Sequence, residues 1–175
     1  MQQYDTYESP IGTLWLTAEN GILTGISFSA DCAAHIPAAT GNVFASVKGW
    51  LDAYFREEVR AIDFLTDPRG TSFQQIIWKL LLEIPYGQTR TYGDLAKEAA
   101  AILGKEKMSA QAVGQAVGRN PIAIVIPCHR IIGAGGKLAG YAYGLERKIW
   151  LLQHERKQEE QKCDTQISDT LKQNG

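Results

Sequence analysis

The chain has 175 residues, of which 45% are hydrophobic and 21% are charged, a composition typical of a soluble globular protein with one domain or two small ones. No apolar run approaches the roughly 18 residues of a membrane-spanning helix, and the first ten residues lack the basic and apolar regions of a signal peptide. Three cysteines, Cys32, Cys128 and Cys163, are too few and too scattered for a disulfide framework or a four-cysteine zinc site. We therefore expect a protein of the reducing cytoplasm, with no metal and no membrane partner.

The net charge of −1 conceals an asymmetry along the chain. Residues 1–85 carry five basic and ten acidic side chains, whereas residues 86–150 carry nine basic and four acidic ones. One interpretation is that these are two solvated surfaces with an incidental bias. The other is a basic C-terminal module that meets an anion, with an acidic N-terminal module turned away from it.

The N-terminal part of the sequence predicts a small antiparallel sheet with a helix on it. Apolar and polar residues alternate in three segments rich in Tyr, Thr, Leu and Ile, at residues 3–8, 12–18 and 21–28. Asn20-Gly21 between the last two segments is a hairpin signal, because both residue types tolerate positive φ. A helix is expected over 43–56, where one face carries Val47, Trp50, Leu51, Tyr54 and Phe55. The turn-forming run from Thr66 to Gly70 marks the boundary of this module, residues 1–69.

Helices dominate the prediction for the second module, residues 70–155. An apolar stripe that ends before Pro85-Tyr86-Gly87 predicts the first helix; its members are Phe73, Ile76, Ile77, Leu80 and Leu81. Thr91 followed by Asp94 resembles a capping box and predicts a short helix over about 91–102. Ser109 is placed to cap another helix, which reaches Val117. Two short helices with a glycine-containing connection fit a helix-turn-helix, and the same spacing fits any pair of packed helices equally well.

An apolar run at residues 121–132 is expected to be extended and buried, with Cys128, His129 and Arg130 in its middle. A glycine-rich loop and a closing helix to about Glu155 follow. Residues 156–175 are rich in Lys, Glu and Gln, which indicates a disordered tail. The sequence thus predicts an α+β fold, in which a small antiparallel sheet with a helix precedes a mostly helical, winged-helix-like module.

Cys128 stands apart from the other two cysteines because of its neighbours. A lone cysteine is usually a small core hydrophobe, and Cys32 is interpreted in that way. Cys128 follows Pro127 and precedes His129 and Arg130, and positive neighbours lower the pKa of a thiol. Polar groups inside an apolar run are costly unless they are paired. We therefore favour a functional site slightly over a buried structural role.

The spacing constrains how His129 could serve Cys128. Adjacent residues of an extended segment point to opposite faces, so proton transfer needs an intervening water or a turn at this point. A third group should orient the imidazole. Glu155 and His154 are the candidates, unless both lie on an exposed helix end.

The residues around Cys128 resemble the signature of the O6-alkylguanine-DNA alkyltransferases, which residues 126–132 match as Ile-Pro-Cys-His-Arg-Ile-Ile. Further similar segments are Ile84 to Ala96, Ala112-Val-Gly114, Gly118 to Pro121, Gly140-Tyr141 and Arg147 to Leu152. The resemblance covers residues 70–155 with high specificity and residues 1–69 only loosely, through Ser9-Pro10-Ile11-Gly12.

This resemblance implies a DNA repair protein that flips O6-alkylguanine out of duplex DNA and transfers the alkyl group irreversibly to itself. Methyl is the expected group, with O4-alkylthymine as a possible further substrate. Cys128 is the implied nucleophile, His129 the base acting through water, and Glu155 the group that orients His129. Tyr92 is implied to donate a hydrogen bond to the departing guanine, and Asn120 to brace the active-site turn. The thioether product is stable, so each molecule reacts once and without a cofactor.

The other residues implied by the resemblance fall into two groups. The residues expected around the flipped base are Gln111, Val117, Ile131, Tyr141, Ala142 and Tyr143. The residues expected to contact DNA together with Tyr92 are Thr91, Ala112, Gly114, Gln115, Arg119 and Arg130. The implied partner is double-stranded alkylated DNA, which a monomer enters through the minor groove. The small residues Ala112 and Gly114 on the second helix of the helix-turn-helix suit a minor groove that is only ~6 Å wide.

Two positions depart from the family pattern. The family often has arginine where this chain has Gln111, and glutamine lacks the charge and planar fork with which arginine fills the hole left by the base. The family commonly has glycine at the position of Tyr143, where a tyrosine narrows the pocket or stacks on the base or backbone.

Three competing functions are weighed against this one. Alkyltransferase-like damage-binding proteins replace the cysteine, which is present here. A cysteine hydrolase usually brings its histidine from a distant segment and has a preformed oxyanion site, and no such pattern is visible. A regulator that uses the helix-turn-helix alone remains an alternative.

Overall fold

The N-terminal part of the molecule is a three-stranded antiparallel sheet. The computed structural model describes residues 1–30 and 42–156, so the predictions for Cys32, Cys163 and residues 157–175 lie outside the described residues. The strands are β1 (Gln2–Ser9), β2 (Gly12–Glu19) and β3 (Ile22–Ser27), in the order β1-β2-β3. Asn20 and Gly21 both have positive φ, at 52° and 78°, so the predicted hairpin between β2 and β3 is confirmed.

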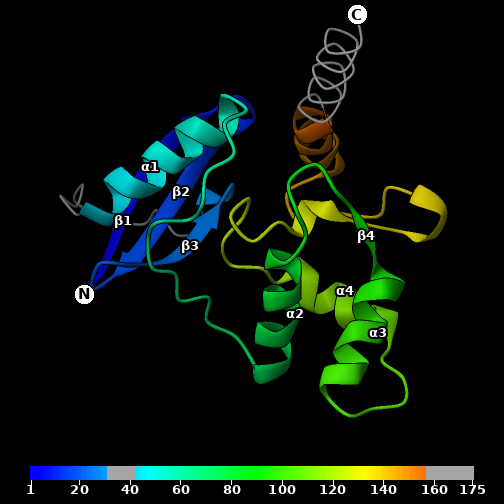
Figure 1. Ribbon diagram of the computed structural model, residues 1–175. Coiled ribbons are helices and arrows are strands. Elements are labelled where there is room, and N and C mark those ends of the chain that lie inside the picture. The colour runs from blue at the N-terminus through cyan, green and yellow to red at the C-terminus, as the bar shows by residue number, and fades with distance from the viewer. Residues whose placement is uncertain (31–41, 157–175) are drawn as a thin grey trace, which may run out of the picture.

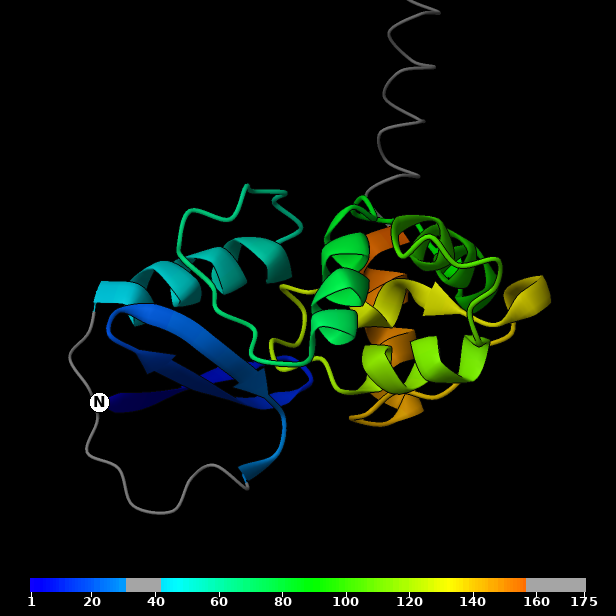
Figure 2. The same cartoon turned by 90° about the horizontal axis from the view of Figure 1, so that it is seen from below.

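Helix α1 (Asn42–Phe55) covers one face of this sheet (Figures 1 and 2). Its buried residues Val47 and Leu51 share one hydrophobic core with Leu14 and Leu16 of β2. Val47 and Leu51 of the predicted apolar stripe therefore belong to the face that packs on the sheet.

Three consecutive helices lie in the other half of the molecule, beside the sheet in both views (Figures 1 and 2). They are α2 (Ser72–Leu82), α3 (Tyr92–Ile102) and α4 (Ala110–Gly118). Thr91 and Asp94 form the predicted capping box of α3, and the Ser109 hydroxyl caps α4 by accepting from the Ala112 amide. The indole of Trp78 on α2 donates to the Ala116 carbonyl of α4 at 2.9 Å, which ties the two helices together. Residues 103–109 connect α3 to α4, a longer connection than the usual three- or four-residue helix-turn-helix turn.

The segment 121–132 is buried, as predicted, but it is not one extended strand. Its first residues pair with the edge of β3: the Ile26 amide donates to the Pro121 carbonyl at 2.9 Å, and the Ala123 amide donates to the Ile26 carbonyl at 3.0 Å. The chain then turns at Ile124, whose φ is +69° and whose neighbours close a three-residue turn.

A 3₁₀ helix, η2 (Cys128–Arg130), follows this turn, and only Ile131–Ile132 forms a strand, β5. β5 pairs in parallel with β4 (Arg90–Thr91). An apolar run indicates burial rather than conformation, and Pro127 cannot donate to a ladder. The expectation of an extended segment was therefore wrong at Cys128, His129 and Arg130.

The chain continues through the short 3₁₀ helix η3 (Ala134–Gly136) and a loop into a helix over residues 145–156. This C-terminal helix begins close to the predicted position, and Arg156, predicted to open the tail, still belongs to it. Among the described residues, no helix has the length and apolar character needed to cross a lipid bilayer.

Candidate active site

A cavity of about 210 Å³ lies between α4, the start of α3 and the loop before the C-terminal helix, with Cys128 in its wall. The residues around it are Tyr92, Gly114, Val117, Gly118, Asn120, Cys128, Gly140, Tyr141, Ala142 and Tyr143. The structure thus brings Cys128 together with Tyr92, Asn120 and three of the predicted base-contacting loop residues. The cavity is smaller than the roughly 300–1,000 Å³ of typical small-molecule pockets, so it suits a single small group.

Asn120 holds the thiol and the turn around it. Its side-chain amide donates to Cys128 Sγ at 3.1 Å and to the Ile126 carbonyl at 2.7 Å. Its Oδ1 accepts from the Ile122 amide at 3.0 Å. Tyr141 lies on the other side of the thiol; its buried hydroxyl makes no hydrogen bond of ordinary geometry among the described residues but is close enough to the sulfur to lower the thiol pKa. These contacts fix Sγ at the cavity wall.

The pKa of Cys128 is raised, and the prediction that basic neighbours lower it was wrong. Burial is the main cause, because a thiolate loses its hydration there. The Asn120 hydrogen bond and the charge of Lys148 oppose the shift without overcoming it. Since Arg130 and His129 both turn toward Glu155, their polarity serves the carboxylate rather than the sulfur. The resting site therefore holds a neutral thiol that needs a base.

His129 is fully buried, and the turn at η2 aims its ring at the C-terminal helix. Its Nε2 lies 2.7 Å from Glu155 Oε1, while its Nδ1 has no hydrogen-bond partner among the described residues. Burial lowers the pKa of His129, and Glu155 only partly restores it. We infer a neutral imidazole whose Nε2–H donates to Glu155, which leaves the Nδ1 lone pair free to accept a proton.

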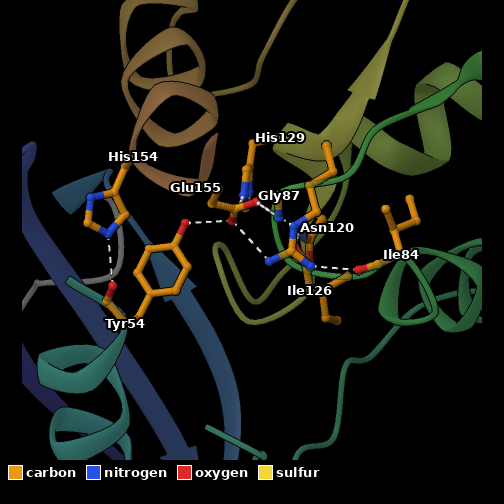
Figure 3. A network of polar contacts seen from close by, with 9 residues as sticks. Tyr54, Ile84, Gly87, Asn120, Ile126, His129, His154 and Glu155 are labelled. Carbon is orange, nitrogen blue, oxygen red and sulfur yellow. Dashed lines mark hydrogen bonds and ion pairs between the residues drawn. The ribbon is translucent and has the colours of Figure 1, made fainter. Parts of the chain in front are cut away.

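Glu155 accepts hydrogen bonds from four residues that belong to three different segments of the chain (Figure 3). Oε1 accepts from the Tyr54 hydroxyl at 2.8 Å, from His129 and from Arg130 Nη2, and Oε2 accepts from the Gly87 amide and from Arg130 Nε. His129 and Arg130 hold the pKa of this buried carboxyl well below its usual range. Glu155 is therefore an anion that is fully hydrogen-bonded.

His154 faces away from His129. Its Nε2 lies 2.8 Å from the backbone carbonyl of Tyr54, and its ring stacks on Trp150. Both His154 and Glu155 are buried, so the alternative of an exposed helix end was wrong. Of the two candidates for the orienting group, the structure brings Glu155 to the imidazole.

Two predicted contacts need correction. Arg130 was expected to contact DNA, but its guanidinium is buried, pairs with Glu155 and donates from Nη1 to the Ile84 carbonyl at 2.7 Å. A buried carboxylate requires a cation, and Arg130 provides it. Ile131 was expected beside the base, but it is fully buried in β5 and does not line the cavity.

The other predicted DNA contacts lie on α4 or at the start of α3. Gln111 and Gln115 are exposed on α4, and Gln111 lies one turn before Gly114, which lines the cavity. Thr91 caps α3, next to Tyr92. The exposed basic side chains of residues 86–150 are Lys97, Lys105, Lys107, Arg119 and Lys137.

Sequence reasoning assigned no site role to Tyr54 or Lys148. Lys148 is fully buried and its ammonium group donates to the Ala139 carbonyl at 2.7 Å, which anchors the loop. Tyr54 was read only as part of an apolar stripe. A buried tyrosine hydroxyl usually has a partner, and that rule was the available signal.

Within residues 1–30 and 42–156, no group of three or more His, Cys, Asp or Glu side chains is arranged to hold a metal ion.

The sequence matches two family descriptions that together cover most of the chain. Residues 72–157 match the DNA binding domain of 6-O-methylguanine DNA methyltransferase, and residues 3–68 match its ribonuclease-like domain. The chain is 44% identical over 162 residues to the methylated-DNA--protein-cysteine methyltransferase of Mycolicibacterium paratuberculosis, covering 90% of this chain and 94% of the relative. It is 44% identical to the protein of the same name from Methanosarcina acetivorans, covering 87% and 97%.

Solved structures agree with these matches. The crystal structure of Mycobacterium tuberculosis OGT in complex with DNA has a TM-score of 0.78 and 43% sequence identity, over 89% of this chain and 93% of that chain. Since both halves of the sequence match the family and the fold matches its solved members, this chain belongs to the 6-O-methylguanine DNA methyltransferase family.

Proposed function

We propose that this protein repairs O6-alkylguanine in duplex DNA by moving the alkyl group to Cys128, in a reaction that consumes the protein. One observation carries the proposal: a buried thiol stands in the wall of a small cavity beside α4, and the next residue, His129, is paired with Glu155. Family membership supports the reaction class.

DNA is proposed to enter along α4 through the minor groove, where Ala112 and Gly114 allow a close approach. The target base must leave the stack to reach the thiol. Gln111, one turn from the cavity, is the residue we assign to the hole that the base leaves. Tyr141, Ala142 and Tyr143 would then surround the flipped guanine.

The transfer is a direct displacement at a saturated carbon. The Cys128 Sγ–C bond forms as the bond between the carbon and guanine O6 breaks, and the thiol proton moves through a water to the free Nδ1 of His129. Glu155 stabilises the imidazolium that results. The guanine anion is stabilised by a hydrogen bond from Tyr92, and it becomes neutral guanine by taking up a proton from water, while the imidazolium of His129 returns its proton to water. These protein groups complete the displacement without a cofactor.

Residues 70–155 are assigned to DNA binding and alkyl acceptance, and residues 1–69 to support of that module. A single copy supplies every group of the reaction, so we propose that the protein acts as a monomer. Because the acceptor must remain a free thiol, we place the reaction in the reducing cytoplasm.

Intact-mass measurement after incubation with O6-methylguanine duplex tests the proposal. We expect the mass to rise by one methyl group per molecule and then stop, with peptide mapping placing the methyl on Cys128. Cys128→Ser should bind DNA and transfer nothing, because a serine hydroxyl is scarcely ionised near neutral pH. The same substitution at Cys32 or Cys163 is the matched control and should leave transfer intact.

The outcomes also separate the competing functions. DNA binding without any adduct would indicate a damage-binding protein or a regulator, and repeated turnover would indicate a hydrolase. A methyl group on another cysteine would overturn the assignment of Cys128.

A further inference from the structure

Tyr54 connects α1 to the proposed proton relay. Its hydroxyl donates to Glu155 Oε1 at 2.8 Å, and the same oxygen lies 2.7 Å from His129 Nε2 (Figure 3). The two residues of this contact are 101 positions apart in the sequence, and the Tyr54 side chain is 3% exposed. Tyr54 on α1 and the imidazole of His129 therefore both contact the same carboxylate oxygen, Glu155 Oε1.

The position of the Tyr54 hydroxyl is fixed from several sides. Its ring stacks on Trp50 at 5.6 Å between centroids and meets Phe55 and Tyr86 edge-on at 5.2 and 5.8 Å. His154 lies 2.8 Å from the backbone carbonyl of Tyr54. A ring held in this way cannot withdraw its hydroxyl from Glu155 without repacking its neighbours.

We propose that Tyr54 is a positioning residue that sets how strongly Glu155 accepts the hydrogen bond from His129, so that α1 takes part in alkyl transfer. This inference rests on the proposed function of His129 as the base. Oε1 accepts from three donors, and each donor reduces the electron density available to the others. Tyr54 is the only neutral side-chain hydroxyl among them, so it tunes this oxygen without changing the net charge of the site.

Loss of the Tyr54 hydroxyl should raise the pKa of His129. Glu155 Oε1 would accept more strongly from the imidazole and would favour its protonated form. The other groups that act on this pair stay in place; they are Arg130 on η2, Lys148 on the C-terminal helix and Tyr86. Because transfer needs neutral His129, the acidic limb of the rate profile should move to higher pH.

The test is the pH dependence of single-turnover transfer to Cys128 at saturating duplex, measured for the full chain and for Tyr54→Phe. We expect the inflection to move up by about 0.5 to 1 pH unit, a fraction of the strength of one hydrogen bond to a charged group, because the imidazole feels the change only through Glu155. Tyr86→Phe is the matched control: it removes a neighbouring hydroxyl that is buried and has no hydrogen-bond partner among the described residues. Its inflection should coincide with that of the unmodified protein.

If the Tyr54→Phe protein does not fold well enough to be purified, a second variant that retains the tyrosine ring and hydroxyl can be used. A ring-fluorinated tyrosine at position 54 is a stronger donor, and it should move the inflection to lower pH. An unmoved inflection in these variants would overturn the role of Tyr54. Failure of the proposed function is distinguishable, because then the unmodified protein transfers nothing to Cys128, or His129→Gln retains the same inflection.

Discussion

The Glu155 carboxylate accepts five hydrogen bonds in the protein interior. Glu155→Gln removes the negative charge of this side chain and leaves its size and shape almost unchanged. All of its contacts are N–H or O–H donors, and two of them come from the buried guanidinium of Arg130. A glutamine has one acceptor oxygen, and its NH₂ group must face a donor. The substitution therefore leaves a buried cation unpaired and at least one donor unsatisfied.

Breaking a buried ion pair by removing one partner costs about 3–5 kcal/mol of folding free energy. In a chain of this size, each kcal/mol lowers the melting temperature by about 2–4 °C. We therefore expect Glu155→Gln to melt roughly 6–20 °C below the unmodified protein, from the product of these two ranges. Thermal unfolding followed by circular dichroism measures the difference. Transfer should also slow, because the imidazolium loses its counter-ion.

Glu58→Gln is the matched control, since it makes the same chemical change on the surface. Glu58 lies 3.2 Å from both Arg56 and Arg60, and these side chains are 46–62% exposed. Exposed pairs contribute about 0–1 kcal/mol, so this variant should melt within a few degrees of the unmodified protein. If Glu155→Gln melts as Glu58→Gln does, the argument from the buried charge is wrong.

The pH dependence gives a second check on the same charge. The pKa of Glu155 is lowered from its ordinary value of 4.5, so its contribution to stability is present above that value and declines as the pH falls toward the folded-state pKa. The difference in melting temperature between the unmodified protein and Glu155→Gln should therefore narrow below about pH 4.

Two further predictions concern DNA. Gln111→Ala should slow repair of duplex substrate and Gln111→Arg should speed it or tighten binding, with effects of at most a few kcal/mol. If Gln111→Ala repairs at the wild-type rate in a rapid-quench assay, Gln111 does not fill the space left by the flipped base. Affinity for undamaged duplex should fall as salt rises, by about 0.9 log unit per log unit for each neutralised phosphate. Since five basic side chains of residues 86–150 are exposed, we expect a slope no steeper than about −4.5 in a fluorescence-anisotropy titration, whereas an affinity independent of salt would contradict the electrostatic account.

Local signals in the sequence predicted the regular elements well. Helix α3 begins after Thr91 because the Thr91–Asp94 capping box is complete within four residues, and β2 turns into β3 at Asn20-Gly21 because both residues tolerate positive φ. These features depend on neighbours in the chain. The resemblance of residues 126–132 to a known family also brought Cys128, His129 and Glu155 into one hypothesis, and the structure places the last two in contact.

The features that sequence reasoning missed depend on contacts between distant segments. The turn at Cys128 follows a pairing between Ile26 and the residues around Pro121, which no local pattern reveals. The role of Arg130 was misjudged because its partner Glu155 lies 25 positions further along. The same contact explains why Arg130 does not offset the effect of burial on the thiol pKa, since this cation already has a carboxylate partner.

The order of synthesis gives the Glu155 junction a further consequence. Cys128 and His129 precede Glu155 in the sequence, and Tyr54 precedes it by 101 positions, so a growing chain contains the thiol before it contains the carboxylate. Contacts of such separation carry a larger loop-closure entropy than local contacts and form more slowly. In an incompletely folded chain, Cys128 is therefore present while His129 still lacks its partner Glu155. For a molecule that reacts once, we expect alkyl transfer to begin only when the chain has finished folding.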